Sequence, residues 1–347
     1  MAPKTVLVTG ANGFIGSAAC RAFSLAGWTT YGLIRSERSA ADLIREEVTP
    51  IIGSPADPST FISTLPAIDV IATCSEDLVH YQAHFNDVLA LIKQVSARSK
   101  AQGAGKPLVI FTSGCKDYGT TLRHGEAGLA PHTEESPLRP PPILVPRCES
   151  GVHILTAYTD EFDCVVTRPT TLYGRSSSFY SQLFQVLDQA KTQPDGTRVV
   201  TIPSTPTSIL HGTHIDDVGA AYVALATAPR HIVAGQAYNI SAHRYETLAE
   251  IVAVVERVEG VKVSYGDAAS GSNTTFLKAF FDFPQWVGSD KLRRDTGWSD
   301  KKSLFHEGYQ VYRNTYRLAA EEKSEQFVRA SKIAVAADVN EANKWSV

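Results

Sequence analysis

A glycine-rich turn near the N-terminus constrains the fold of this chain more than any other stretch. The segment VTGANGFIG places three glycines between an apolar run, residues 5–10, and a stretch with apolar groups at helical spacing, residues 14–27. Glycines here allow a tight turn and a close approach to a pyrophosphate, while the helix N-terminus supplies amides and partial positive charge. The turn therefore predicts a dinucleotide site. The residues expected to line it are Gly10, Asn12, Gly13, Phe14, Ile15 and Gly16.

Short apolar runs and longer helical patterns alternate through the first half of the chain. The runs are apolar throughout, as is typical of parallel strands that are covered on both faces. Because the connections between them are short, we predict an α/β fold with a Rossmann-like, doubly wound parallel sheet. Its expected strands are residues 5–10, 29–35, 48–53, 69–74, 107–114 and 163–169.

The length of 347 residues favours one large domain or two joined ones. We predict a dinucleotide-binding Rossmann domain, a smaller C-terminal substrate-binding lobe, and a tail that packs, contacts an oligomer partner or frays. Residues 115–145 are rich in glycine, proline and charge, and form either a linker or an active-site wall. The expected boundaries are 1–170 with about 208–242, about 171–207 with 243–320, and 321–347.

Composition excludes several classes of function. A net charge of −3 and a pI of about 6.4 leave no basic field for nucleic acid or anionic lipid, and the apolar runs are too short to span a bilayer. The first residues enter a strand at once, without room for a signal peptide. Five widely spaced cysteines form no CxxC pair, and ten histidines form no HExxH pattern, so we expect no metal site. We expect a cytoplasmic protein with a small-molecule substrate.

The end of the second expected strand bears on the choice of cofactor. A carboxylate at this place would hold the ribose diol of NAD(H), but the segment GLIRSERSA presents Arg35 and Arg38. Guanidinium groups suit a 2′-phosphate, which favours NADP(H) over NAD(H). The alternative is that both arginines are simply solvated.

Several motifs, in order, resemble those of the extended or atypical short-chain dehydrogenase/reductase superfamily, which includes NAD-dependent epimerases and dehydratases. The segments are TGANGFIG, DVIATCSED, VIFTSGCKDYG, VVTRPTTLYG and THIDDVGAAYVAL, and the resemblance covers residues 4 to about 312. It implies cofactor contacts at Thr73, Arg168 and Pro169, and a substrate-orienting hydroxyl at Ser113, with Thr112 as the alternative. It also makes a homodimer an option.

The same resemblance exposes a missing pair of residues. In that family a tyrosine transfers the proton, and a lysine four residues later lowers its pKa. In LRPPPILVPRCESGVHIL, Val145 stands at the tyrosine position and Glu149 at the lysine position, and no Tyr-x-x-x-Lys occurs in residues 115–175. A glutamate reverses the local charge, so the sequence predicts that the usual hydride-transfer machinery is absent.

Several side chains are candidates to replace the pair. Tyr118 is a proton donor or a packing residue, and Arg147 is a source of positive charge beside the cofactor or a substrate oxyanion. Glu149 is a general base or, on the simpler interpretation, a helix-surface carboxylate. Lys116 is close to Ser113, although an exposed loop lysine is the plainer interpretation.

Two further candidates lie later in the chain. His214 is an acid/base candidate near neutral pH, with His211 close by. Asp217, which follows them, is expected to cap the next helix.

The substrate side carries many aromatic residues, and SILHGTHIDD lacks the arginine that usually binds a diphosphate in nucleotide-sugar epimerases. If the aromatics line the cleft rather than the core, they favour a small apolar or aromatic substrate. Reduction of a carbonyl or enone is the leading hypothesis. The alternatives are non-redox isomerisation, dehydration or cyclisation, and a non-catalytic NAD(P)-binding regulator. The aromatics are Phe179, Tyr180, Phe184, Phe276, Phe280, Phe281, Phe283 and Trp286.

Overall fold

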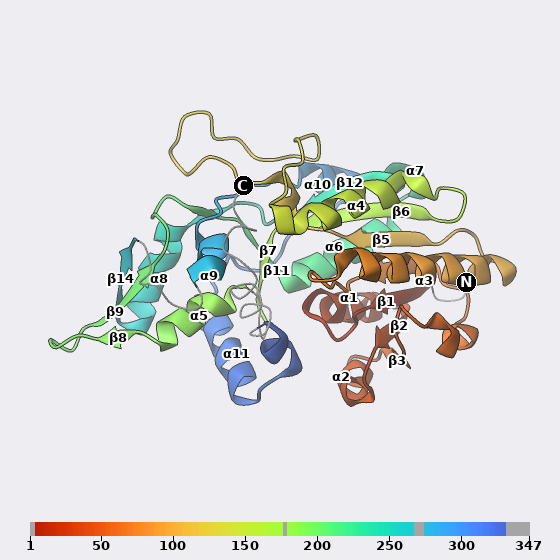
Figure 1. Cartoon of the computed structure of the whole chain (residues 1–347), viewed down its shortest axis with the longest axis horizontal. Coiled ribbons are helices and arrows are strands. Elements are labelled where there is room, and N and C mark those ends of the chain that lie inside the picture. Colours follow the sequence, from red (N-terminus) through yellow and green to blue (C-terminus); the bar gives the residue numbers. More distant parts are fainter. Residues whose placement is uncertain (1–3, 176–178, 267–273, 331–347) are drawn as a thin grey trace.

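The computed structural model describes residues 4–175, 179–266 and 274–330, and contains the predicted doubly wound sheet (Figure 1). All seven strands are parallel, in the order β12-β6-β5-β4-β1-β2-β3. The chain reverses its direction of travel between β1 and β4, and ligands of such sheets bind outside the strand ends at this point. The strands are β1 (Thr5–Thr9), β2 (Thr29–Ile34), β3 (Thr49–Ile52), β4 (Val70–Thr73), β5 (Leu108–Thr112), β6 (Asp163–Pro169) and β12 (Gln236–Ile240).

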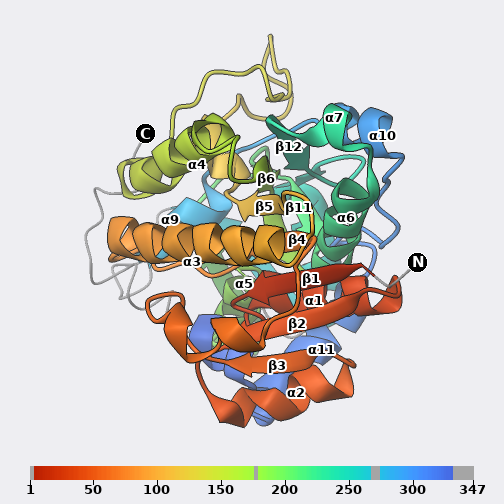
Figure 2. The same cartoon turned by 90° about the vertical axis from the view of Figure 1, so that its right-hand side faces the viewer.

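Helices cover both faces of the sheet (Figure 2). Val6 and Val8 of β1 belong to the core under α1 and α6, whereas Leu7 belongs to the core under α3 and α4. This alternation explains why the strands are apolar throughout. The helices of this domain are α1 (Phe14–Leu25), α2 (Ala40–Arg45), α3 (Tyr81–Ala101), α4 (Val145–Ala157), α6 (Ile215–Thr227), α7 (Arg230–Val233) and α10 (Asp290–Thr296).

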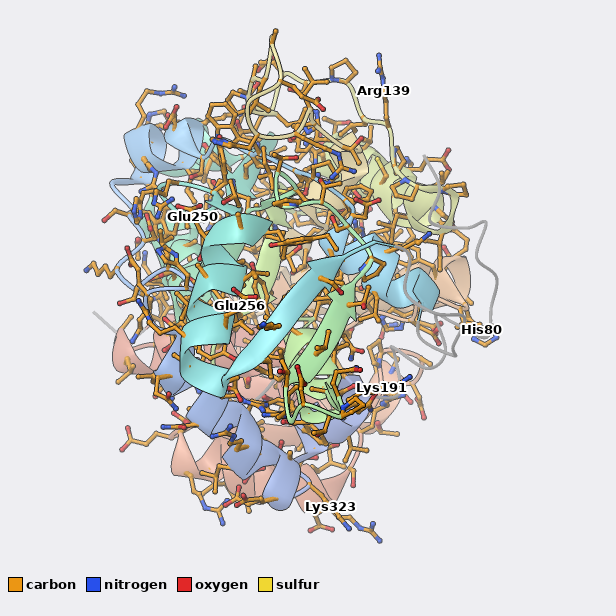
Figure 3. All side chains as sticks on the ribbon, turned by 90° about the vertical axis from the view of Figure 1, so that its left-hand side faces the viewer. His80, Arg139, Lys191, Glu250, Glu256 and Lys323 are labelled. Carbon is orange, nitrogen blue, oxygen red and sulfur yellow. The ribbon has the colours of Figure 1, made fainter. Side chains whose placement is uncertain are left out.

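A smaller lobe lies beyond the strand ends and is built mainly from the second half of the chain (Figures 1 and 3). The hydrophobic core of this lobe is formed by α5, α8 and α11 and includes the aromatic ring of Phe305. Thr247 and Glu250 cap α8 reciprocally, which satisfies two amides of its first turn. Its main elements are α5 (Ser181–Asp188), β8 (Lys191–Thr192), β9 (Arg198–Ile202), α8 (Leu248–Glu259), β14 (Val261–Tyr265), α9 (Thr274–Phe281) and α11 (Tyr309–Glu321).

Two short strand pairs join the domain to the lobe. β7 (Thr171–Tyr173) pairs with β11 (Gly212–His214), and β10 (Ile209–Leu210) pairs with β13 (Glu246–Thr247). Strands of two or three residues are too short to show a periodic pattern, which is why the sequence did not predict them. None of the described helices is long and apolar enough to cross a membrane.

Candidate active site

The glycine-rich turn has the geometry that a dinucleotide requires. Gly10 adopts a φ of +61°, and a Cβ on Gly16 would lie 2.1 Å from the Gly10 carbonyl oxygen. Gly13 begins α1 without a side-chain cap, and no acidic residue lies in the first turn. The first amides of α1 are therefore not capped by the chain's own side chains, and suit the phosphates of a cofactor.

The other predicted cofactor residues lie around this turn with different exposures. Phe14 and Ile15 are half-buried against the core under α1, and Thr73 is buried at the end of β4. Arg35 and Arg38 are exposed in the segment that follows β2. Pro169 ends β6.

A buried polar cluster occupies the place where the tyrosine–lysine pair is expected. The Ser113 hydroxyl donates to Asp117 Oδ2 at 2.5 Å, and Arg147 Nη2 donates to Asp117 Oδ1 at 2.6 Å. Arg147 also lies 3.8 Å from Glu76, which follows β4. A Cβ added to Gly151 of α4 would lie 3.8 Å from the Ser113 side chain, so α4 passes close to Ser113 at this glycine. The Asp117 carboxylate, which the sequence did not indicate, thus bridges the Ser113 hydroxyl and the Arg147 guanidinium.

Tyr118 and Arg168 are both committed to a second buried network. The Tyr118 hydroxyl donates to Asn239 Oδ1 at 2.8 Å and accepts from Arg168 Nη1 at 2.9 Å. Tyr118 is 1% exposed, and burial raises the pKa of its phenol. A proton donor with both bonds inside the protein has no free path to a substrate, so the geometry disfavours Tyr118 in that role.

Lys116, in the loop after β5, points into the protein rather than into solvent. The interpretation of an exposed loop lysine is wrong, because the side chain turns inward and its ammonium donates to the Ala279 carbonyl of α9 at 3.0 Å. The same ammonium lies 3.6 Å from the centre of the Phe283 ring. Burial, with the charge of Arg147 adding to it, lowers the pKa of Lys116 to about 7.

Lys116 lines a small cavity between the sheet and the lobe, together with apolar side chains and the polar residues Thr171, His211 and Gln285. Its volume of about 10 Å³ holds roughly one water molecule and is too small for an organic substrate as the cavity stands. Of the aromatics noted in the sequence, Tyr180, Phe280 and Phe283 line this cavity. Tyr180 and Phe280 also belong to the lobe core, as do Phe184 and Phe281. Phe179 is at the surface, Trp286 packs against Tyr245, and the side chain of Phe276 lies outside the described residues.

His214 caps α6 in place of Asp217, for which the sequence predicts that role. His214 is the N-cap of α6, where its Nδ1 accepts from the Asp216 amide at 3.1 Å, and burial lowers its pKa to about 4. The prediction that Asp217 caps this helix is wrong, because its carboxylate accepts from the amides of Lys301 and Lys302. His214 is therefore neutral at pH 7 and serves the fold.

Glu149 lies on the exposed surface of α4. We expect Glu149→Gln to leave turnover unchanged and to change the free energy of unfolding by less than about 0.5 kcal/mol, because surface substitutions without special contacts are nearly neutral. Steady-state assays and urea unfolding test this. A large loss of turnover with unchanged stability would instead make Glu149 a base.

Comparison with known proteins agrees with this geometry. Residues 6–241 match the NAD-dependent epimerase/dehydratase family. The chain belongs to this family. No curated protein matches it.

Several solved structures share the fold of this family member. A UDP-glucose 4-epimerase from Thermotoga maritima, solved with UDP-glucose, is 16% identical with a TM-score of 0.69, covering 91% of this chain and 99% of its own. A dTDP-glucose 4,6-dehydratase from Streptomyces venezuelae, solved with NAD, is 20% identical with a TM-score of 0.64, covering 90% and 97%. A short-chain dehydrogenase/reductase superfamily protein from Agrobacterium tumefaciens, with bound NAD, is 14% identical with a TM-score of 0.64, covering 92% and 99%. At these identities the likeness establishes the fold alone.

Proposed function

We propose that this family member is an NAD(P)-dependent enzyme that reduces a carbonyl or enone on a small, largely apolar or aromatic molecule. The observation that carries the proposal is the inward-turned Lys116, which follows Ser113 by three residues and lines a small cavity with Phe280 and Phe283. Such an amine is an acid/base group that needs no phenol. In the described lining of this cavity Lys116 is the cation, and no arginine is present to receive a diphosphate.

The cofactor is proposed to bind at the glycine-rich turn, with Gly10, Gly13 and Gly16 against its pyrophosphate. It supplies a hydride when bound. The preference for NADP(H) stays a prediction, supported by the exposed guanidinium groups of Arg35 and Arg38 at the end of β2.

The protein's own residues perform the proton chemistry in this proposal. Lys116, as the ammonium, donates a proton to the substrate oxygen as that oxygen gains negative charge. Arg147 donates a hydrogen bond to Asp117 and balances its charge. Asp117 accepts a hydrogen bond from the Ser113 hydroxyl, which fixes the direction of that hydroxyl. Phe280 and Phe283 line the same cavity and limit the space beside the amine to about one water molecule.

A second function rests on the same amine. Because the pKa of Lys116 is about 7, a large fraction is neutral at pH 7, and the neutral form is a base. A base that lines a small cavity suits isomerisation or dehydration by removal of a proton next to a carbonyl.

One experiment separates these functions. Apolar and aromatic ketones, aldehydes and enones are incubated with the full chain and NADPH or NADH, while absorbance at 340 nm and product mass are followed. Reduction predicts loss of absorbance in proportion to product. Product without loss of absorbance favours the non-redox function, and cofactor binding without turnover of any compound favours a regulator.

A further inference from the structure

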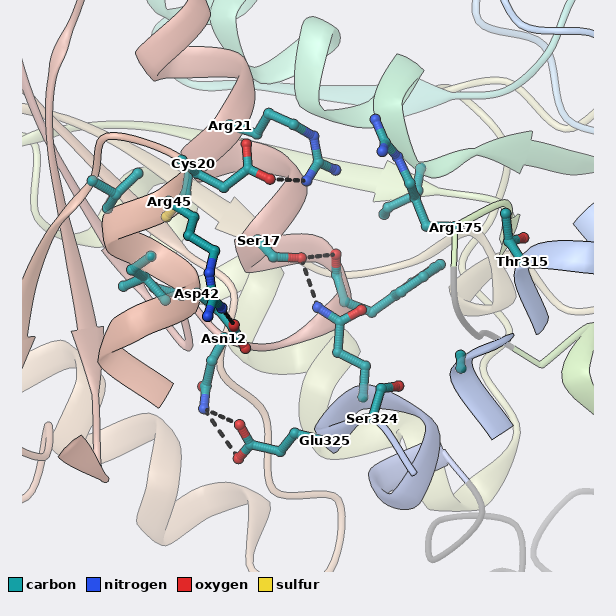
Figure 4. Close-up of a pocket in the computed structure, with 18 of the residues that line it drawn as sticks. Asn12, Ser17, Cys20, Arg21, Asp42, Arg45, Arg175, Thr315, Ser324 and Glu325 are labelled. Atoms are coloured by element: carbon teal, nitrogen blue, oxygen red, sulfur yellow. Dashed lines mark hydrogen bonds and ion pairs between the residues drawn. The ribbon is translucent and has the colours of Figure 1, made fainter. Parts of the chain in front are cut away.

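The C-terminal segment folds back onto the predicted cofactor turn. Residues 325–330 are helical and follow α11, with the Phe327 ring against Tyr316. Gln326 Nε2 donates to the Ser17 hydroxyl of α1 at 2.9 Å. The segment, α1 and α2 enclose a cavity of about 420 Å³, which Figure 4 shows between Asn12, Ser17 and Glu325. We call residues 324–330 the C-terminal strap.

Glu325, in the C-terminal strap, bonds to the loop after β1 and to the loop after β2. The Glu325 carboxylate accepts from the side-chain amide of Asn12 at 3.2 Å, as Figure 4 shows, and from the Ser39 hydroxyl at 2.6 Å. Arg329 pairs with the same carboxylate at 2.5 Å. Burial opposes ionisation, but the Ser39 hydrogen bond and the Arg329 charge hold the pKa of Glu325 below its ordinary value. Glu325 is therefore an anion at neutral pH.

The loops after β1 and β2 are those that contact the adenosine half of a dinucleotide in this fold. Asn12 belongs to the turn after β1, which holds the pyrophosphate in this fold, and Ser39 follows β2, whose end reads the ribose 2′ position. Arg35 and Ser36 stand directly after β2, where the usual carboxylate is expected, and Glu37, which follows them, is exposed. Glu325 supplies a carboxylate to this corner from the other end of the chain.

We infer that Glu325 is a specificity-determining residue that opposes NADP(H) relative to NAD(H), an inference that rests on the proposed cofactor site. A carboxylate accepts a hydrogen bond from a 2′-hydroxyl and repels a 2′-phosphate. Arg35 and Arg38 attract the same phosphate, and Arg329 offsets part of the charge of Glu325, so the balance among these four groups sets the preference of the full chain.

Binding of NADPH and NADH to the full chain, measured by tryptophan fluorescence or calorimetry without substrate, tests the inference. Glu325→Gln keeps the size of the side chain and removes its charge. We expect Kd for NADPH to fall about tenfold, which corresponds to about 1.4 kcal/mol, and Kd for NADH to change less than about twofold. Glu322→Gln is the matched control, since Glu322 lines the same cavity and carries the same charge, whereas Asn12 and Ser39 bond to Glu325. It should leave both Kd values unchanged.

Two other results have distinct meanings. If both cofactors bind and Glu325→Gln leaves the ratio of their Kd values as it is in the wild type, the strap does not select the cofactor, and the inference fails alone. If neither cofactor binds to the wild type or to either variant, the cofactor proposal fails together with it.

Discussion

Lys116→Met should lower the rate of substrate reduction by about 10²–10⁴-fold, the usual contribution of a positioned general acid. Methionine keeps an unbranched chain against Phe283 but has no proton to give. Because Lys116 is not among the residues of the glycine-rich turn, Kd for the cofactor should stay within about twofold of the wild type. Single-turnover rates and fluorescence titration measure the two quantities. Lys301→Met removes an exposed lysine and is the matched control, with no change in either.

The same substitution should make the protein more stable. Burial lowers the pKa of Lys116 to about 7 from the ordinary 10.5, so the unfolded chain binds more protons between these values. The stability of the wild type therefore rises with pH across this window, and is lowest below pH 7, where the amine is charged in both states. Lys116→Met lacks this slope and should have a higher Tm at pH 7. Unchanged turnover or a lower Tm would contradict the role given to Lys116.

Arg147→Ala should destabilise the fold by about 3–5 kcal/mol, the usual result of removing one partner of a buried ion pair. Asp117 is 1% exposed and would lose the guanidinium that binds it at 2.6 Å. Urea unfolding measures the loss. Arg175→Ala is the control, because its pair with Asp216 is half exposed and should contribute less than about 1 kcal/mol.

Partial rescue identifies the cause of that loss. Adding Asp117→Asn to Arg147→Ala removes the uncompensated charge, and should recover a substantial part of the stability without restoring turnover. If the double variant is no more stable than Arg147→Ala, the loss comes from packing of α4 rather than from the buried charge.

The glycine-rich turn and the sheet could be predicted because their signals are local. Three glycines, an apolar run and a helical pattern lie within about twenty residues, and each strand carries its own burial in its composition. The missing tyrosine–lysine pair was also visible, because it is a fixed spacing on one helix.

The site itself depends on contacts between distant segments. The Lys116 ammonium meets the Ala279 carbonyl 163 positions later, and Ser39 meets Glu325 286 positions later. A polar, proline-rich loop gives no sign that its lysine turns inward, since its burial is made by α9. A histidine side chain suits both acid/base chemistry and helix capping. The bond from the Asp216 amide, which the sequence does not show, identifies His214 as a cap.

The pH dependence of the hydride-transfer step tests the central claim most directly. With Lys116 as the proton donor, the single-turnover rate followed at 340 nm should be level at low pH and fall as pH rises through about 7, where the ammonium is lost. Lys116→Arg, which stays protonated, should retain its residual rate across the same range. A wild-type rate that is level from pH 6 to 9, or a fall near pH 7 that persists in Lys116→Arg, would show that another group supplies the proton.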